Sequence, residues 1–359
     1  MAQMHLIPVD RLRAAVRYLV KGFGSDDREI ELVTENLIQA NLTGHDSHGV
    51  GILPRYAEAY LEGSLKPNAR IQTRMDNGSM IGLDGECGFG QAIGYQAMEL
   101  GIARAKEHGS CILALGNSHH LCRIGAWAEM TVEQGLISIH FVNVISRPIV
   151  APFGGGDARF GTNPFTVGIP VPGQDPILLD FATSVIAQGK ARVALNKGEQ
   201  LPEGYLIDDQ GRPTTDPIFA VKAPLGALCT FGEHKGFGLA LICEILGGAL
   251  AGGMTTHSPP DGKRRIINGM LSIIFDPAKL ADGSIFEHEM KAFIEWVKAS
   301  PPQPGGEQVR IAGEPERETR AQRLAQGVPV DETTWNEMLE TAKKLGLDAA
   351  QLQKLAGLQ

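Results

Sequence analysis

The chain has 359 residues, of which 43% are hydrophobic and 21% charged, a balance that favours a folded globular protein over a disordered one. The formal net charge of −8 and the lack of a basic patch argue against nucleic acid or an anionic membrane as a partner. The sequence contains no signal-peptide pattern and no apolar stretch of membrane-spanning length, so we expect a cytoplasmic protein.

Five cysteines are scattered along the chain without a Cys-x-x-Cys pair. This pattern predicts reduced thiols that mostly act as small core residues, and it does not suggest zinc binding or redox exchange. The 44 glycines often lie beside apolar strands, which indicates tight turns and close approach of the backbone to a ligand.

The first part of the chain has helical patterns. A helix is expected over Val9–Lys21, and a second begins at residues 25–27, where side-chain oxygens can cap the exposed amides. This second helix leads the chain to His45. A third helix starts at Pro54 and is ended by Gly63, and the pattern changes after residue 68.

From residue 70 onward, strand and helix patterns alternate, which predicts an α/β domain. Strands are expected at 80–83, 111–115, 136–142, 165–169, 177–181 and 270–275, and helices at 91–107, 124–134, 235–250 and 286–298. The helix over 235–250 is almost entirely apolar, so we expect it to be buried on most sides, whereas that over 286–298 is amphipathic.

A Pro- and Gly-rich linker follows at 300–306, and short helical stretches come after it, ending with a helix over 345–358. We expect these C-terminal helices to pack on the N-terminal ones. The predicted organisation is an N-terminal helical segment (1–68), an α/β domain (69–312) and a C-terminal helical segment (313–359).

Residues 44–50 bring a hydroxyl, a carboxylate and two imidazoles close together, and we interpret them as the acid/base part of an active site. Imidazole has its ordinary pKa nearest neutral pH, which suits proton transfer. A second polar run, residues 117–120, should form a loop at a sheet edge, where His119 or His120 could face the site. The alternative is a helix cap with both rings in solvent.

Residues 88–94, with the sequence GFGQAIG, resemble a dinucleotide phosphate loop. We reject a Rossmann fold because the strand before them ends early, no acidic ribose partner ends a second strand, and the β-α-β alternation is irregular. A glycine-rich turn that starts a helix is the preferred interpretation.

Polar groups also follow two apolar strands, among them Asp180 and Thr183, which otherwise would only cap the next helix. His234 and Lys235 open the apolar helix, where amides and a cation could hold a phosphate, unless the charge stands there by chance. His45, His48, His119 and His120 match no familiar metal motif, so no metal is predicted, and a zinc hydrolase remains a minor alternative.

Together these segments resemble the malate/L-lactate dehydrogenase family of NAD(P)-dependent oxidoreductases, which lack a Rossmann fold. The segments that carry this resemblance span nearly the whole chain: DSHGV at 46–50, NSHH at 117–120, RFGTNP at 159–164, DFATS at 180–184, KGFGLA at 235–240 and GEP at 313–315. Further segments at 44–48, 151–153, 243–250 and 295–301 resemble the hydroxycarboxylate dehydrogenase branch.

The resemblance implies a fold and a reaction. The fold would be α/β, with a mixed-sheet nucleotide-binding domain like that of sulfolactate dehydrogenase and an accessory domain built from the terminal helices, in a homodimer. The reaction would be reversible hydride transfer between NAD or NADP and a 2-oxo or 2-hydroxy acid, with the protein supplying a proton. Malate, lactate and ureidoglycolate are alternative substrates within the family.

The resemblance also implies site residues. Ser47, His48 and His120 correspond to the catalytic group, and which histidine carries the proton stays open. The segments that would contact the dinucleotide comprise His48, Cys122, Arg123, Ile124, Leu178, Leu179, Asp180, Phe181, Ala182, His234, Lys235, Gly313, Glu314 and Pro315.

Two positions depart from the family pattern. Many relatives have an arginine for the substrate carboxylate where this chain has Ile52, so Arg123 or Arg55 is expected to take that role. The imino-acid-reducing branch has an aspartate where this chain has Lys190, which makes a cyclic imine substrate less favourable than a 2-oxo acid.

Overall fold

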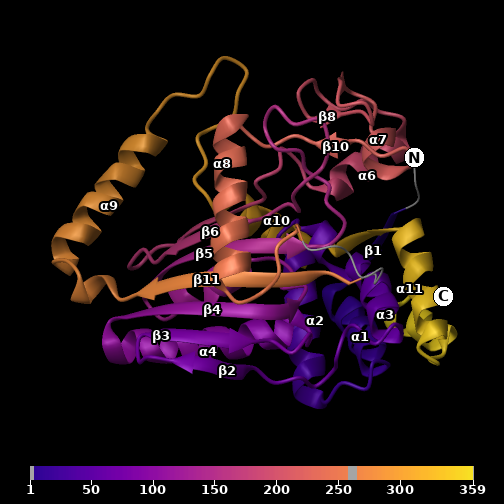
Figure 1. Ribbon diagram of the computed structural model, residues 1–359, viewed down its shortest axis with the longest axis horizontal. Helices are drawn as coiled ribbons and strands as arrows, with labels where there is room; N and C mark the ends of the chain where they lie inside the picture. Colours follow the sequence, from indigo (N-terminus) through magenta and orange to yellow (C-terminus); the bar gives the residue numbers. More distant parts are fainter. Residues whose placement is uncertain (1–3, 258–264, 359) are drawn as a thin grey trace.

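The computed structural model describes residues 4–257 and 265–358, and its centre is a seven-stranded mixed sheet (Figure 1). The strand order is β2-β3-β4-β11-β5-β6-β7; β3 and β4 run parallel, and the other neighbours are antiparallel. The strands are β2 (Gln72–Asp76), β3 (Met80–Asp84), β4 (Ser110–His119), β5 (Ile137–Ile145), β6 (Phe165–Ile169), β7 (Ile177–Phe181) and β11 (Ile267–Phe275). This arrangement confirms the predicted non-Rossmann α/β fold, because a Rossmann sheet is mostly parallel.

Helices α4 (Gly90–His108) and α5 (Gly125–Val132) pack against the sheet. Ile93, Ala97 and Met98 of α4 are buried together with Leu113 and Leu115 of β4. The apolar face of α4 packs on the alternating apolar residues of β4. This packing fixes the helix on the strand, so the first turn of α4 lies near the end of β4.

A smaller unit lies in the chain between strands β7 and β11 of the sheet. It contains the short strands β8 (Leu206–Ile207), β9 (Pro213–Thr214) and β10 (Ala227–Leu228), in the order β10-β8-β9, together with helices α6 (Gln188–Lys197) and α7 (Ile218–Val221). These two-residue strands were not predicted because they are too short to show an alternating pattern.

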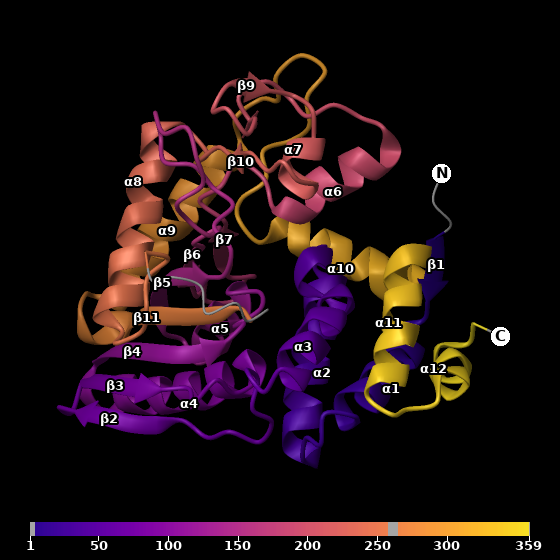
Figure 2. The same cartoon turned by 45° about the vertical axis from the view of Figure 1, so that its right-hand side comes forward.

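The two ends of the chain form a helical layer beside the sheet (Figure 2). Strand β1 (Met4–Ile7) pairs antiparallel with β12 (Val328–Asp331), and α1 packs against α12. The layer comprises α1 (Val9–Lys21), α2 (Asp27–Leu42), the 3-10 turns η1 (Asp46–His48) and η2 (Val50–Ile52), α3 (Leu53–Leu61), α10 (Glu314–Gln326), α11 (Glu332–Lys344) and α12 (Ala349–Ala356).

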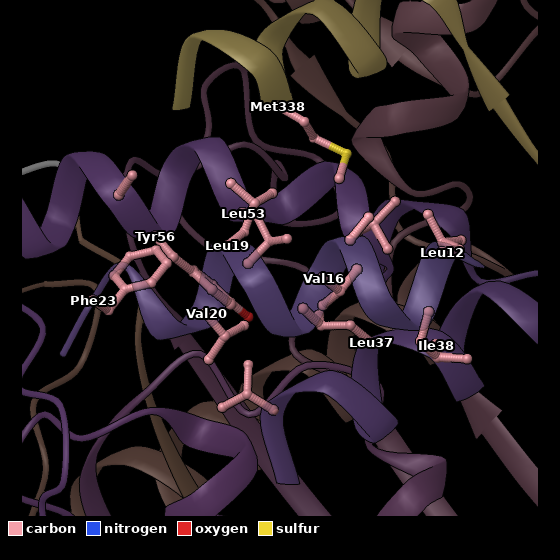
Figure 3. Close-up of a cluster of buried hydrophobic side chains, with 14 of the residues drawn as sticks. Leu12, Val16, Leu19, Val20, Phe23, Leu37, Ile38, Leu53, Tyr56 and Met338 are labelled. Atoms are coloured by element: carbon pink, nitrogen blue, oxygen red, sulfur yellow. The ribbon is translucent and has the colours of Figure 1, made fainter. Parts of the chain in front are cut away.

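The core of this layer is a large apolar cluster (Figure 3). It includes Leu12, Leu19, Leu37 and Leu53, all with no exposed surface. Tyr56 is equally buried among them, and it is the member whose hydroxyl must find a polar partner. Burial of this cluster fixes α3 relative to α1 and α2.

Three sequence expectations prove wrong. The apolar helix is split into α8 (His234–Cys243) and the π-helical η3 (Glu244–Leu250), and it is not buried on most sides, because Leu241, Ile242, Ile245 and Leu250 are exposed. The expected helix over 345–358 begins only at Ala349, since residues 345–348 form the turn after α11. Residues 117–119 are the end of β4 and not a loop.

Helix α9 (Gly283–Lys298) follows β11 and the turn η4 (Pro277–Lys279), and it stands at the edge of the molecule (Figure 1). None of its residues is buried, although its sequence is amphipathic. No helix within the described residues has the length and apolar character needed to cross a membrane.

Candidate active site

The loop that carries His48 is held at its base by ionic hydrogen bonds. Arg323 of α10 donates to both carboxylate oxygens of Asp46, at 2.6 and 2.9 Å, and Asn41 of α2 donates to the same carboxylate at 2.7 Å. The Ser47 hydroxyl lies 3.0 Å from Nδ1 of His48. Asp46 therefore anchors the loop, while Ser47 and His48 are left to face the site.

His120 follows directly on β4 and lies opposite His48. The two rings stack with centroids 5.5 Å apart and an angle of 24° between their planes. His120 is buried, and its Nδ1 lies 2.8 Å from the Tyr56 hydroxyl. The alternative of solvent-exposed rings at 119 and 120 is wrong, because both side chains are buried.

The surroundings keep these histidines uncharged. Burial lowers the pKa of His48 to about 4 and that of His119 to about 3, and it lowers the pKa of His120 well below its usual value. The negative charge of Asp180 opposes the shift at His48, and the nearby charge of Arg55 adds to the shift at His120. An imidazole in such a place takes up a proton most easily when an anion is bound beside it.

Asp180, at the end of β7, connects the site to the sheet. Its carboxylate accepts hydrogen bonds from the Gly125 amide at 2.7 Å and from the Thr166 hydroxyl at 2.8 Å. Neither it nor Thr183 caps the next helix, since α6 starts after Ala187. That interpretation was wrong, and the sheet edge explains both side chains better.

Arg123 is almost completely buried and forms an ion pair with Glu129 at 2.5 Å. Asp180 also contributes to the raised pKa of Arg123. Its guanidinium is therefore paired with Glu129 and lies in the field of Asp180, while its Nε has no hydrogen-bond partner among the described residues. Arg55, on α3, is exposed and lies on the His120 side of the site.

The segments expected to contact a dinucleotide meet at the end of β7. The Leu178 amide donates to the Ala312 carbonyl at 3.2 Å, and a Cβ on Gly313 would lie 3.3 Å from Leu178, so residues 313–315 lie along this strand. The Phe231 amide donates to Thr183, which brings the start of α8 to the same edge.

Residues 122–124 follow His120 along the chain, separated from it only by Leu121. The thiol of Cys122 donates to the carbonyl of His48 at 2.8 Å, which ties this segment to the His48 loop. The sheet edge, the His48 loop and the start of α8 thus surround one region.

These groups suit a nicotinamide dinucleotide. Helix α8 starts without a side-chain cap, and the exposed His234 and Lys235 lie in its first turn, so amides and a cation are available for a phosphate. A Cβ on Gly189 would lie 3.3 Å from that of Ser47, so this glycine allows close approach to the His48 loop.

Ile52 and Lys190, the two positions that depart from the family pattern, lie in different environments. Ile52 packs against the apolar core of the helical layer. Lys190 is exposed in the first turn of α6, one residue after Gly189. No acidic side chain stands at either position.

Two polar residues near His120 were not predicted from the sequence. Tyr56 lies in the third expected helix and Gln91 in the glycine-rich stretch, and neither was given a role, yet Gln91 Nε2 donates to the Tyr56 hydroxyl at 2.9 Å. A buried tyrosine indicates that its hydroxyl has a hydrogen-bond partner. Which residue supplies that partner depends on how α4 packs against α3, and the sequence does not reveal this packing.

Residues 7–339 match the family model described as malate/L-lactate dehydrogenase. The chain belongs to this family and is a dehydrogenase. It is 45% identical to hydroxycarboxylate dehydrogenase B of Escherichia coli over 97% of both chains, and 36% identical to malate dehydrogenase of Pyrococcus abyssi over 95% of both.

A solved structure supports the fold. Sulfolactate dehydrogenase from Methanocaldococcus jannaschii superposes with a TM-score of 0.86 at 31% identity, covering 97% of this chain and 99% of that one. The family is nicotinamide-dependent. In the described parts of the chain, no group of three or more His, Cys, Asp or Glu side chains is arranged to hold a metal ion.

Proposed function

We propose that the protein reduces a 2-oxo acid to the 2-hydroxycarboxylate with NADH or NADPH, reversibly. The observation that carries the proposal is the stacked pair of His48 and His120, two neutral imidazoles beside the segments that suit a dinucleotide. The chain's membership of the dehydrogenase family supports it. Bound nicotinamide supplies the hydride, and the protein must supply the proton.

The roles of the residues follow from their surroundings. Ser47 positions His48 through its hydrogen bond to Nδ1. Arg55 is the better candidate for the substrate carboxylate, because Arg123 is already paired with Glu129. Arg123 and Asp180 then help to bind the dinucleotide, together with Cys122, Ile124, the end of β7, residues 313–315 and, at a phosphate, His234 and Lys235.

The preferred substrate is a 2-oxo acid with an apolar side chain. Ile52 stands where many relatives have an arginine for the substrate carboxylate, so an apolar side chain occupies that position and favours an apolar group on the substrate. Lys190 replaces the aspartate of the imino-acid branch, which disfavours a cyclic imine. Malate, lactate or ureidoglycolate oxidation is the alternative within the same family.

The test is a spectrophotometric assay of the purified protein with NADH or NADPH and a panel of 2-oxo acids. We expect loss of the reduced-nicotinamide absorbance, fastest with apolar side chains. Absence of turnover with every member of the panel would contradict the proposal. Faster turnover of malate, lactate or ureidoglycolate in the oxidative direction would favour the alternative.

We further propose that the protein is a cytoplasmic homodimer. All five cysteines are free, as expected in a reducing compartment. Support for self-association comes from the exposed apolar side chains of α8, η3 and α9, and from a hollow of about 530 Å³ lined by Trp296, Val297 and Val309. The exposed apolar set is Leu241, Ile242, Ile245, Leu250, Ile285, Phe293 and Trp296.

Light scattering after size-exclusion chromatography tests this arrangement. The wild-type protein should have twice the mass of one chain, and Trp296→Glu should shift it towards the monomer. Leu280→Glu is the control, because Leu280 is 77% exposed and lies outside these helices. A monomeric wild-type protein would contradict the homodimer.

A further inference from the structure

The glycine-rich stretch 88–94 starts α4 directly behind His120. A Cβ on Gly90 would lie 2.0 Å from the carbonyl oxygen of His120, so a larger residue cannot occupy this position without a shift of the strand end. The His119 amide also donates to the Gly88 carbonyl at 3.1 Å. The stretch therefore holds the backbone that carries His120.

The next residue of this stretch, Gln91, reaches the ring of His120 through Tyr56. Gln91 Nε2 donates to the Tyr56 hydroxyl at 2.9 Å, and that hydroxyl lies 2.8 Å from Nδ1 of His120. The sulfur of Cys122, whose S–H donates to the carbonyl of His48, also interacts with this hydroxyl, and its lone pairs stay free to accept a proton from it. Tyr56 and Gln91 are at most 1% exposed, so water does not compete for these bonds.

The hydroxyl of Tyr56 has one proton to donate and two positions that accept. The amide of Gln91 occupies one accepting position. If the hydroxyl donates its proton to the sulfur of Cys122, its second accepting position is filled by an N–H at Nδ1 of His120. If it donates to His120 instead, neutral His120 carries its only proton on Nε2 and has no lone pair there for a substrate proton.

We propose that Tyr56, held by Gln91, is a positioning residue that keeps a proton on Nδ1 of His120, so that Nε2 exchanges the proton with the substrate oxygen. This inference rests on the proposed reductase function. In reduction, the N–H bond at Nε2 breaks and an O–H bond forms on the product as hydride reaches C2, and His120 is left neutral. In oxidation, Nε2 takes the hydroxyl proton and hydride leaves C2.

The direct test is nitrogen NMR of ¹⁵N-histidine-labelled protein without substrate, with the His120 signals assigned from His120→Gln. The neutral ring of His120 should carry its proton on Nδ1 in the wild-type protein and lose this preference in Tyr56→Phe. A proton on Nε2 in the wild-type protein, or an unchanged signal in the variant, would overturn the proposal.

Kinetics provide the second readout. Tyr56→Phe should lower kcat about 10- to 100-fold and change cofactor affinity by less than about twofold, because an incorrectly held tautomer affects proton transfer and not dinucleotide binding. The control is Tyr60→Phe on the same helix, whose ring packs on Phe23 and which should keep wild-type kcat and NMR signals. An equal loss of kcat in both variants would contradict the role of Tyr56.

The NMR test separates this inference from the proposed function. The spectrum is recorded without substrate, so an absence of 2-oxo acid turnover in the wild-type protein contradicts the reductase function alone. Wild-type turnover with an unchanged Tyr56→Phe enzyme contradicts the role of Tyr56 alone.

Discussion

His120 and His48 face each other, but the protein supports them in different ways. His120 follows a strand at the centre of the sheet and is backed by α4 and by the buried hydroxyl of Tyr56. His48 lies on a 3-10 turn of the helical layer and is held mainly through Asp46 and Arg323. The comparison indicates that His120 has the fixed ring orientation that proton transfer requires, whereas His48 belongs to an element that can adjust to a ligand.

The largest expected effect is a difference in kcat between variants of His120 and His48. His120→Ala should lower kcat for 2-oxo acid reduction about 10²- to 10⁴-fold, the range typical of a lost general acid. His48→Ala should lower it less. Steady-state kinetics with cofactor titration check this, and both variants should still bind cofactor. A greater loss in His48→Ala would reverse the assignment.

The next effect concerns the support behind His120. Gly90→Ala should lower the free energy of unfolding by about 1–3 kcal/mol, because the added methyl group overlaps the His120 carbonyl. Gly238→Ala, in α8, has no neighbour within 4 Å and should be neutral or slightly stabilising. Denaturant unfolding measures the stability of both variants. Equal stability would show that α4 does not pack closely against the His120 backbone.

The smallest effect concerns the His48 loop. Arg323→Ala removes the partner of Asp46, and we expect a loss of about 1 kcal/mol of stability, because the pair is only partly buried. KM should rise more than kcat falls, since the loop loosens while His120 stays in place. Arg320→Ala on the same helix removes only a bond to Gln39 and is the control. An unchanged KM in Arg323→Ala would show that the loop is held elsewhere.

Much of the fold follows from the sequence, and the failures have physical reasons. The residues of β6 and β7 were predicted at their observed positions because their apolar alternation is clear. Helix α8 was expected to be buried because it is almost entirely apolar, and an apolar pattern alone does not distinguish a buried helix from one that leaves apolar side chains exposed. Residues 117–119 looked like a loop because all three side chains are polar, and the neighbours that bury Ser118 and His119 are distant in the chain.

The site was predictable only in part. The histidines and the polar strand ends can be recognised in the sequence, and the resemblance assigns them roles. The choice between Arg123 and Arg55 depends on Glu129, which lies one to two turns along α5 and pairs with Arg123. The contact of Gln91 with Tyr56 depends on how α4 meets α3, which only the packing determines.

The measurement that tests the central claim most directly is the pH dependence of kcat/KM for 2-oxo acid reduction in the wild-type, His120→Gln and His48→Gln enzymes. Reduction needs protonated His120, whose pKa burial holds well below its usual value, so the protonated fraction of free enzyme grows as pH falls. The wild-type kcat/KM should therefore rise about tenfold per unit as pH falls from about 8 to about 6. His48→Gln should keep this slope and His120→Gln should lose it. A flat wild-type profile, or a slope that survives in His120→Gln, would contradict His120 as the proton carrier.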